Sequence, residues 1–241
     1  SITGLSAGGV TVTDTKSYKI EISDPGSFPF KLDLALSGYT GASTLLDFPV
    51  LVSLSASIPG FSYNGFLDPD GDGVRDGGDL RVFAANGKEL PYEIADWNTS
   101  GTSNIWVKVP SISGTDTVIT AAWGKTGTEI TPDYASLDPV WSNDYNGVWH
   151  FSGNSTDFED SSGNAHHASR NSVATVSNGR VGQAATFSGS QFAEIPFSEL
   201  LNTDEFSVSI WANRSSGTVH ASPFSSRQLT IAGSTIRKGY V

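Results

Sequence analysis

The residues of this chain with the clearest chemistry are the acids between Asp68 and Asp79. Counted from Asp68 as position 1, carboxylates stand at positions 1, 3, 5, 9 and 12 and a glycine at position 6, which is the ligand spacing of an EF-hand calcium loop. Ca²⁺ takes about six to eight oxygen ligands, and alternating carboxylates supply them when the chain wraps around one point. The sequence therefore predicts a Ca²⁺ site formed by Asp68, Asp70, Asp72, the carbonyl of Val74, Asp76 and Asp79.

The last position of this loop departs from the EF-hand pattern. A bidentate Glu is usual there, and the shorter Asp79 reaches less far, which would weaken the site or change its geometry. The alternative is an Asp- and Gly-rich surface turn without metal. Its acids would repel one another with only Arg75 to offset them, and this repulsion favours a bound cation.

A second kind of chemistry is sugar binding, in which exposed aromatic rings stack on the apolar faces of sugars. Most of the six tryptophans lie in alternating strand patterns, where a Trp is usually part of the core. Trp97 is followed by the polar run that begins at Asn98, so we expect these two residues at the rim of a loop. They are the candidate ligand-binding residues.

Other polar clusters give weaker signals. Asp157, Glu159 and Asp160 could hold a second Ca²⁺, but their spacing matches no fixed loop, and solvated acids are the better interpretation. His166 and His167 are neighbours, and adjacent strand residues point to opposite faces, which argues against zinc and favours a surface loop.

We expect no catalytic activity, and therefore no catalytic residues. The string Gly4-Leu5-Ser6-Ala7-Gly8 matches a nucleophile elbow, but that motif needs a helix after it, and β-type residues follow here. A pair of acids for glycoside cleavage is defined by a three-dimensional separation and cannot be assigned from spacing.

Composition limits the possible partners. The net charge of −11 argues against nucleic acid and an anionic membrane surface as partners, and no apolar run approaches the ~18 residues of a membrane span. Without cysteine there are no disulfides, thiolate catalysis or Cys-ligated zinc. Abundant Gly, Ser, Thr and Asn with only 16% charged residues is typical of extracellular or cell-surface β-rich proteins. At 241 residues the chain suggests two domains.

Short apolar or alternating runs between turn residues predict an all-β chain. The expected strands are Tyr18–Ile22, Phe48–Leu54, Leu80–Ala84, Pro91–Trp97, Ile105–Val109, Val118–Trp123, Val148–Phe151, Gln191–Ile195 and Phe206–Trp211. Asn86-Gly87 predicts a hairpin between two of them. We expect a β-sandwich at residues 1–126, a linker at 127–140 and a jelly roll at 141–241. Residues 1–40 are either an edge strand of the sandwich or the tail of a preceding domain.

Residues ~40–125 resemble a bacterial domain family of unknown function found in large surface and envelope proteins. The resemblance rests, in order, on Phe48-Pro49-Val50-Leu51-Val52, Gly78-Asp79-Leu80-Arg81-Val82-Phe83, Leu90-Pro91-Tyr92-Glu93-Ile94, Ile105-Trp106-Val107-Lys108-Val109-Pro110 and Ala121-Ala122-Trp123-Gly124-Lys125. It implies a β-sandwich and no established activity. Asp79 belongs to this pattern, so it is expected to serve the fold as well as the metal. Residues 68–76 look like an added acidic loop, similar to thrombospondin type 3 or dockerin calcium loops.

Residues ~141–241 resemble a laminin-G-like, concanavalin-type jelly roll. The matching strings are Gly147-Val148-Trp149-His150-Phe151, Asp160-Ser161-Ser162-Gly163-Asn164, Gly182-Gln183-Ala184-Ala185-Thr186-Phe187-Ser188-Gly189 and Phe206-Ser207-Val208-Ser209-Ile210-Trp211. Such domains need roughly half as many residues again, so we expect a truncated jelly roll, or one that a neighbouring chain completes.

The sequence thus predicts a non-catalytic, Ca²⁺-stabilised segment of a bacterial surface or secreted protein that acts in adhesion or glycan binding. The alternative is a structural subunit or spacer of an extracellular assembly or filament. A further alternative is an accessory module of a polysaccharide-active enzyme.

Overall fold

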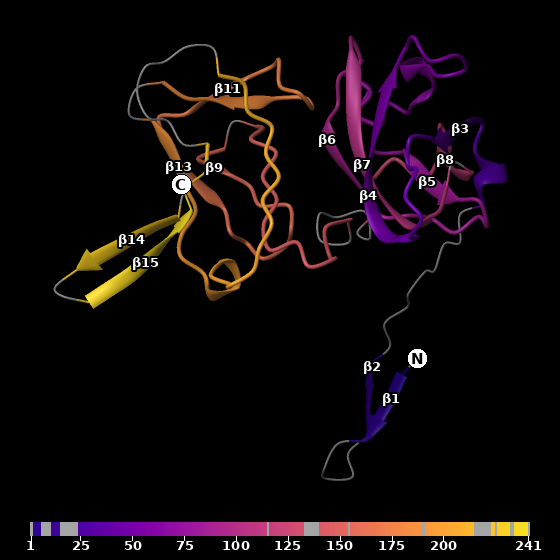
Figure 1. Ribbon diagram of the computed structural model, residues 1–241. Helices are drawn as coiled ribbons and strands as arrows, with labels where there is room; N and C mark the ends of the chain where they lie inside the picture. The colour runs from indigo at the N-terminus through magenta and orange to yellow at the C-terminus, as the bar shows by residue number, and fades with distance from the viewer. Residues whose placement is uncertain are drawn as a thin grey trace.

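The computed structural model describes residues 2–5, 11–14, 24–114, 116–132, 140–153, 155–188, 191–214, 223–224, 226–231 and 234–240. The elements in these ranges are β-strands with single turns of 3-10 helix between them, as the all-β prediction requires (Figure 1). No helix in these ranges is long and apolar enough to cross a membrane.

The first half is a β-sandwich of two antiparallel sheets, each with three strands (Figure 1). One sheet has the order β3 (Phe30–Leu36), β8 (Thr117–Trp123) and β5 (Arg81–Ala84). The other has the order β4 (Leu45–Ser55), β7 (Thr102–Ile112) and β6 (Tyr92–Asp96). Five of the predicted strands are confirmed here, and β3 was missed.

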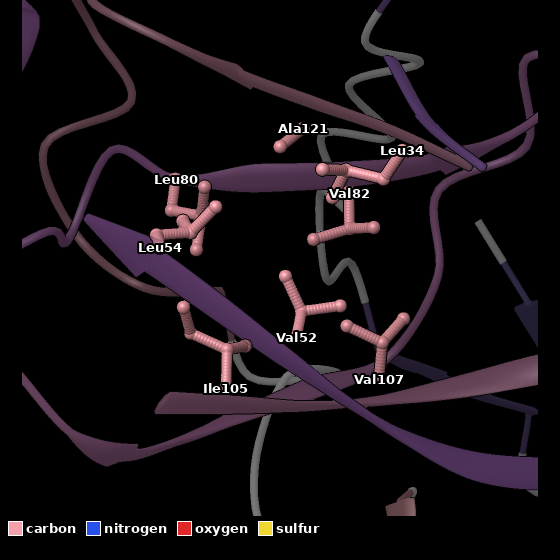
Figure 2. Close-up of a pocket in the computed structure, with 8 residues that line it drawn as sticks. All are labelled: Leu34, Val52, Leu54, Leu80, Val82, Ile105, Val107 and Ala121. Atoms are coloured by element: carbon pink, nitrogen blue, oxygen red, sulfur yellow. The ribbon is translucent and has the colours of Figure 1, made fainter. Parts of the chain in front are cut away.

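The core of the sandwich lies between the two sheets. Along β7, Ile105, Val107 and Val109 are buried and alternate with more exposed residues, because successive side chains of a strand point to opposite faces. Figure 2 shows apolar side chains from both sheets facing one another around a small gap, which is lined by Leu34, Val52, Leu54, Leu80, Val82, Ile105, Val107 and Ala121. The lining is hydrocarbon throughout, so we assign this gap to core packing.

The turn at Asn86-Gly87 forms as predicted, but it does not join two strands of one sheet. Gly87 adopts a left-handed φ of 80°, which glycine accepts without strain, and its N–H donates to Ala84 O at 2.9 Å. The returning arm pairs only as far as Leu90, whose N–H donates to Val82 O at 2.7 Å. The chain then crosses to the other sheet as β6, so the predicted hairpin is a turn between the two layers.

Tyr92, the first residue of β6, is fully buried, and its hydroxyl donates to Leu80 O at 2.6 Å. Burial raises the pKa of the Tyr92 hydroxyl to about 12, and the nearby Arg81 charge only partly opposes this. The folded protein therefore holds this proton more tightly than the unfolded chain does, whose Tyr pKa is about 10.

Stability should consequently fall steeply in alkali. The stabilisation linked to the Tyr92 proton is complete below about pH 10 and is lost as the pH rises towards 12, by about 3 kcal/mol in total. Tyr92→Phe removes the ionisable group and should flatten this part of the profile. Urea unfolding at pH 8 and pH 11.5 measures the difference; equal losses in the parent and the variant would contradict it.

The N-terminal residues divide between the sandwich and a separate hairpin. β3 is an edge strand of the sandwich, whereas β1 (Ile2–Leu5) and β2 (Thr11–Asp14) pair only with each other, apart from the sandwich in Figure 1. The predicted strand Tyr18–Ile22 lies outside the described residues.

The second half contains smaller sheets. A three-stranded sheet has the order β13 (Phe192–Glu194), β10 (Ala168–Asn171) and β9 (Asp157–Phe158). β11 (Ala174–Val176) pairs with β12 (Ala184–Thr186), and β14 (Ser226–Ile231) pairs with β15 (Ser234–Tyr240). Phe158, Ala168 and Val173 form a small core, against which Trp149, Phe151, Ala185, Ala193 and Ile195 pack.

Two predicted strands of this half are wrong. Val148–Phe151 contributes a single bridge, from Trp149 to Asp160, and residues 206–211 are not in a strand. In the second segment the side chains of Phe206, Val208, Ile210 and Trp211 are exposed. Alternation shows which side chains a strand would bury, but pairing also requires a neighbouring strand.

Candidate metal site

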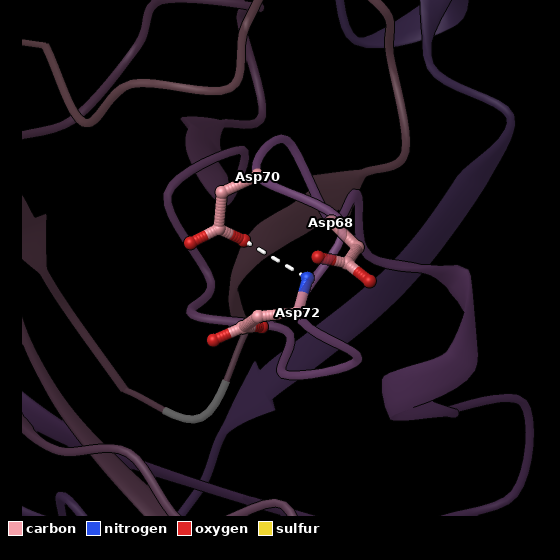
Figure 3. A group of neighbouring side chains, drawn as sticks. All are labelled: Asp68, Asp70 and Asp72. Atoms are coloured by element: carbon pink, nitrogen blue, oxygen red, sulfur yellow. Dashed lines mark hydrogen bonds between the residues drawn. The ribbon is translucent and has the colours of Figure 1, made fainter.

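The acidic loop leaves the sandwich after η2 (Tyr63–Gly65) and returns to it at β5. The oxygens of Asp68, Asp70 and Asp72 lie within 4.8 Å of one another, which is a spacing that one cation could bridge (Figure 3). Asp70 and Asp72 are exposed and Asp68 is half-buried. The elements on either side are a 3-10 turn and a strand, so the loop lacks the flanking helices of an EF-hand.

The loop is shaped by hydrogen bonds from its own backbone to these carboxylates. Asp68 accepts from the N–H groups of Gly71 at 3.0 Å and Gly73 at 3.1 Å, one on each oxygen. Asp72 accepts from Val74 N–H at 2.7 Å. Both glycines have left-handed φ values, 73° and 85°, so the turn depends on residues without a Cβ.

The remaining predicted ligands do not join this group. Asp76 and the side chain of Val74 are exposed, and neither Asp76 nor Asp79 belongs to the cluster of three carboxylates. The structure therefore brings together the first three of the six predicted ligands.

Asp79 is instead a buried part of the sandwich, with 1% of its surface exposed. One oxygen accepts from Leu67 N–H at 3.2 Å and the other from Gly124 N–H at 2.6 Å. Burial raises the pKa of the Asp79 carboxyl, and these hydrogen bonds and the Arg81 charge oppose the rise. Asp79 thus ties the start of the loop to the end of β8.

Arg75 and Trp97 hold the far side of the loop. Arg75 Nη1 donates to Phe66 O at 2.8 Å, and the indole N–H of Trp97 donates to Arg75 O. The Trp97 ring also packs edge-on against Tyr63 and Phe66, with centroids 5.5 and 5.0 Å apart. From the sequence, Arg75 was considered only as a positive charge. No sequence pattern predicts its hydrogen bond to the Phe66 carbonyl.

Trp97 therefore lies next to the acidic loop, but much of its ring is already in contact with the protein. Asn98 is exposed, and its side-chain oxygen accepts from Ser100 N–H at 3.1 Å. Trp211, which we expected in a core, is 76% exposed, with the Arg180 guanidinium 5.3 Å from its ring centroid. Trp211 has the more accessible aromatic ring of the two.

The expectation of solvated acids in the second half is wrong for Asp160, whereas Glu159 is exposed. Asp160 is buried and accepts from the N–H groups of Val148, Ser162 and His166 and from the Ser162 hydroxyl, at 2.8 to 3.0 Å. Glu159 lies 2.9 Å from His167. These interactions build a turn, and no cluster of three metal-ligating acids or histidines forms among these described residues.

The two histidines lie in different environments, but they stand in the loop before β10, so the strand argument does not apply to them. The expectation of a surface position is wrong for His166. His166 is buried, and its ring lies 2.7 Å from Asn146 O through Nδ1 and 2.8 Å from Ser198 Oγ through Nε2. His167 is 41% exposed. Ser6 of the elbow-like string lies outside the described residues, and the next element, β2, is a strand where that motif needs a helix.

Comparison with known proteins gives one match, to a family without an assigned function. The model of a family described as a domain of unknown function (DUF2341) matches residues 76–166. No curated protein and no solved structure matches the chain. The matched segment includes Asp76 and Asp79 but begins after Asp68, Asp70 and Asp72, and it continues past the sandwich as far as His166.

Proposed function

We propose that the chain is a non-catalytic, Ca²⁺-stabilised segment of a bacterial surface or secreted protein, in which a β-sandwich is followed by a laminin-G-like unit. The observation that supports this most directly is the convergence of the Asp68, Asp70 and Asp72 oxygens within 4.8 Å. Carboxylate oxygens are the ligands that Ca²⁺ prefers, and backbone carbonyls and water would complete the shell.

In this proposal calcium acts on stability. It offsets the mutual repulsion of three carboxylates, and because the unfolded chain offers no preformed site, its binding free energy adds to the folding free energy. The loop is tied to the sandwich through Arg75 and Asp79, so ordering the loop also stabilises the strands on either side of it.

Thermal melting at increasing free Ca²⁺ tests this proposal. At about 100 times the dissociation constant the gain is about 2.7 kcal/mol, or roughly 10 °C in melting temperature for a domain of this size. Asp70→Ala and Asp72→Ala should abolish the increase, whereas Asp204→Ala, at an exposed acid outside the loop, should keep it. An unchanged melting temperature of the parent at millimolar Ca²⁺ would contradict the proposal.

For the biological role we propose adhesion or glycan binding. The exposed ring of Trp211 supports it, since such a ring can stack on a sugar. The alternative of a structural subunit is supported by the exposed Val208 and Ile210 in the same segment, which an added strand could cover. Glycan arrays and light scattering on the same preparation distinguish the two roles.

A further inference from the structure

The outer face of one sandwich sheet carries a buried carboxylate. Tyr92 points into the core between the sheets, so its neighbour Glu93 points to the opposite face of the sheet β4–β7–β6. Glu93 lies opposite Trp106 of β7 and is only 5% exposed. A charged group buried at this depth requires hydrogen-bond partners.

These partners come from the second half of the chain. Trp141 Nε1 donates to Glu93 Oε2 at 2.5 Å, and Ser161 Oγ donates to Oε1 at 2.9 Å. His150 Nε2 lies 3.2 Å from Oε1, an ion-pair distance without the alignment of a hydrogen bond. Side chains from three places in residues 141–161 thus converge on one carboxylate.

Aromatic packing surrounds this carboxylate. The Trp106 ring meets Trp141 edge-on, with centroids 5.0 Å apart, and stacks on His150 at 6.2 Å. Trp141 is 5% exposed and also meets Tyr145 edge-on at 5.2 Å. The contact therefore combines buried apolar area with charge-assisted hydrogen bonds, the composition of a stable interface core.

The edges of the contact reach the other strands of the sheet. Asn143 Nδ2 donates to Leu46 O at 3.0 Å and to Asp47 O at 3.1 Å, where the pairing of β4 with β7 skips Asp47, a residue with a left-handed φ of 46°. On β7, Lys108 Nζ donates to Ser142 Oγ at 2.5 Å. Residues 141–161 accordingly touch all three strands.

The predicted linker is also anchored where it leaves the sandwich. The buried Arg81 donates through Nη2 to Thr128 O at 3.1 Å and to Ile130 O at 3.0 Å. At the other end Val140 is fully buried. Both described ends of residues 127–140 are therefore held against the protein.

We infer that residues 141–161 form a joint that docks the second half of the chain on the outer face of the sheet β4–β7–β6, with Glu93 as its anchor. The match to residues 76–166 contains Glu93, Trp106 and residues 141–161, whereas the contacts on β4 lie before it, and such a joint would account for a match that passes from the sandwich into the second half. The inference is independent of calcium, because Asp68, Asp70 and Asp72 contribute nothing to the contact.

The test cuts the chain and asks whether the halves stay together. A site-specific protease sequence is placed between residues 133 and 139 of the full chain, and the dissociation constant of the nicked protein is measured by size exclusion on dilution. The nicked parent should elute as one species at micromolar concentration. Glu93→Ala should raise the dissociation constant at least about 30-fold, because it leaves the buried donors of Trp141 and Ser161 unpaired.

Two further variants change only residues of the second half of the chain. Ser161→Ala and Trp141→Phe each remove one donor to Glu93 and leave the sandwich sequence intact, so each should weaken the nicked pair about tenfold even if Glu93→Ala fails to fold. Glu199→Ala, at an exposed acid, should stay within twofold of the parent. Separation of the nicked parent at micromolar concentration, or unchanged association in Ser161→Ala and Trp141→Phe, would overturn the joint.

Discussion

Asp79→Ala should lower the free energy of unfolding by about 3 kcal/mol. The substitution leaves the N–H groups of Leu67 and Gly124 without acceptors in a site where Asp79 itself is only 1% exposed. Each buried donor left unsatisfied costs about 1 to 3 kcal/mol. The substitution also removes the cost of burying a carboxylate whose pKa is raised by burial. The expected loss is therefore well below the sum of the upper costs of the two donors.

The measurement is urea unfolding in the presence of a calcium chelator. If Asp79 acts through the fold, the loss persists without metal, whereas a loss that appears only with Ca²⁺ would make Asp79 a metal ligand and contradict the structural role. Asp76→Ala is the matched control, since Asp76 lies three residues away and is exposed, and it should stay within about 0.5 kcal/mol of the parent under chelation.

Trp123→Ala should cost about 3 to 5 kcal/mol, the usual range for removal of a large buried aromatic side chain. Trp123 is fully buried at the end of β8, stacked on Phe66 at 5.2 Å and on Phe30 at 5.9 Å. The cavity cannot close easily because these rings come from different segments of the sandwich. Chemical denaturation measures the loss, with intact antiparallel structure checked by circular dichroism.

Trp211→Ala is the matched control for this experiment. Trp211 is 76% exposed, so the same chemical change should alter the free energy of unfolding by about 0.5 kcal/mol or less. Equal losses at the two positions would mean that Trp123 is not the centre of the core that its contacts indicate.

Much of the sandwich could be predicted from the sequence because its strands bury one face. Alternation in Phe48–Leu54 and Ile105–Val109 locates β4 and β7 correctly, although each strand extends further than its apolar run. β3 was missed although Leu32, Leu34 and Leu36 alternate along it and Pro25-Gly26 and Ser37-Gly38 supply turn signals on either side. Its side chains are only partly buried, because it lies at the edge of its sheet.

The acidic loop shows which predicted ligands residue spacing can bring together and which it cannot. Alternation alone was enough to bring Asp68, Asp70 and Asp72 together, because three alternate residues of one tight turn are neighbours in any wrapped conformation. Asp79 is held away from this group by its hydrogen bonds with Leu67 and Gly124, and Gly124 lies 45 residues further along the chain. A pairing over that distance has no local sequence signal.

The same reasoning applies to Glu93. In the sequence it is one acid among 25 acidic residues, placed where an outward-facing strand residue would be solvated. Only the arrival of Trp141, His150 and Ser161 makes it a buried group. The domain boundary at 127–140 was predicted from the local Gly and Pro residues. Such a local signal carries no information on contacts between the residues on its two sides.

The pairing of β3 with β8 has a consequence for the order in which the protein folds as it is synthesised. Phe30 pairs with Trp123, so the sheet β3–β8–β5 cannot close until some 90 intervening residues have left the ribosome. β6 and β7 are adjacent in sequence and can pair first, and β4 can then add to β7. We therefore expect the nascent chain to form the sheet β4–β7–β6 first, with its apolar face uncovered until β8 has been synthesised. A premature stop or a slow codon before residue 117 would prolong this stage and expose the apolar face to aggregation.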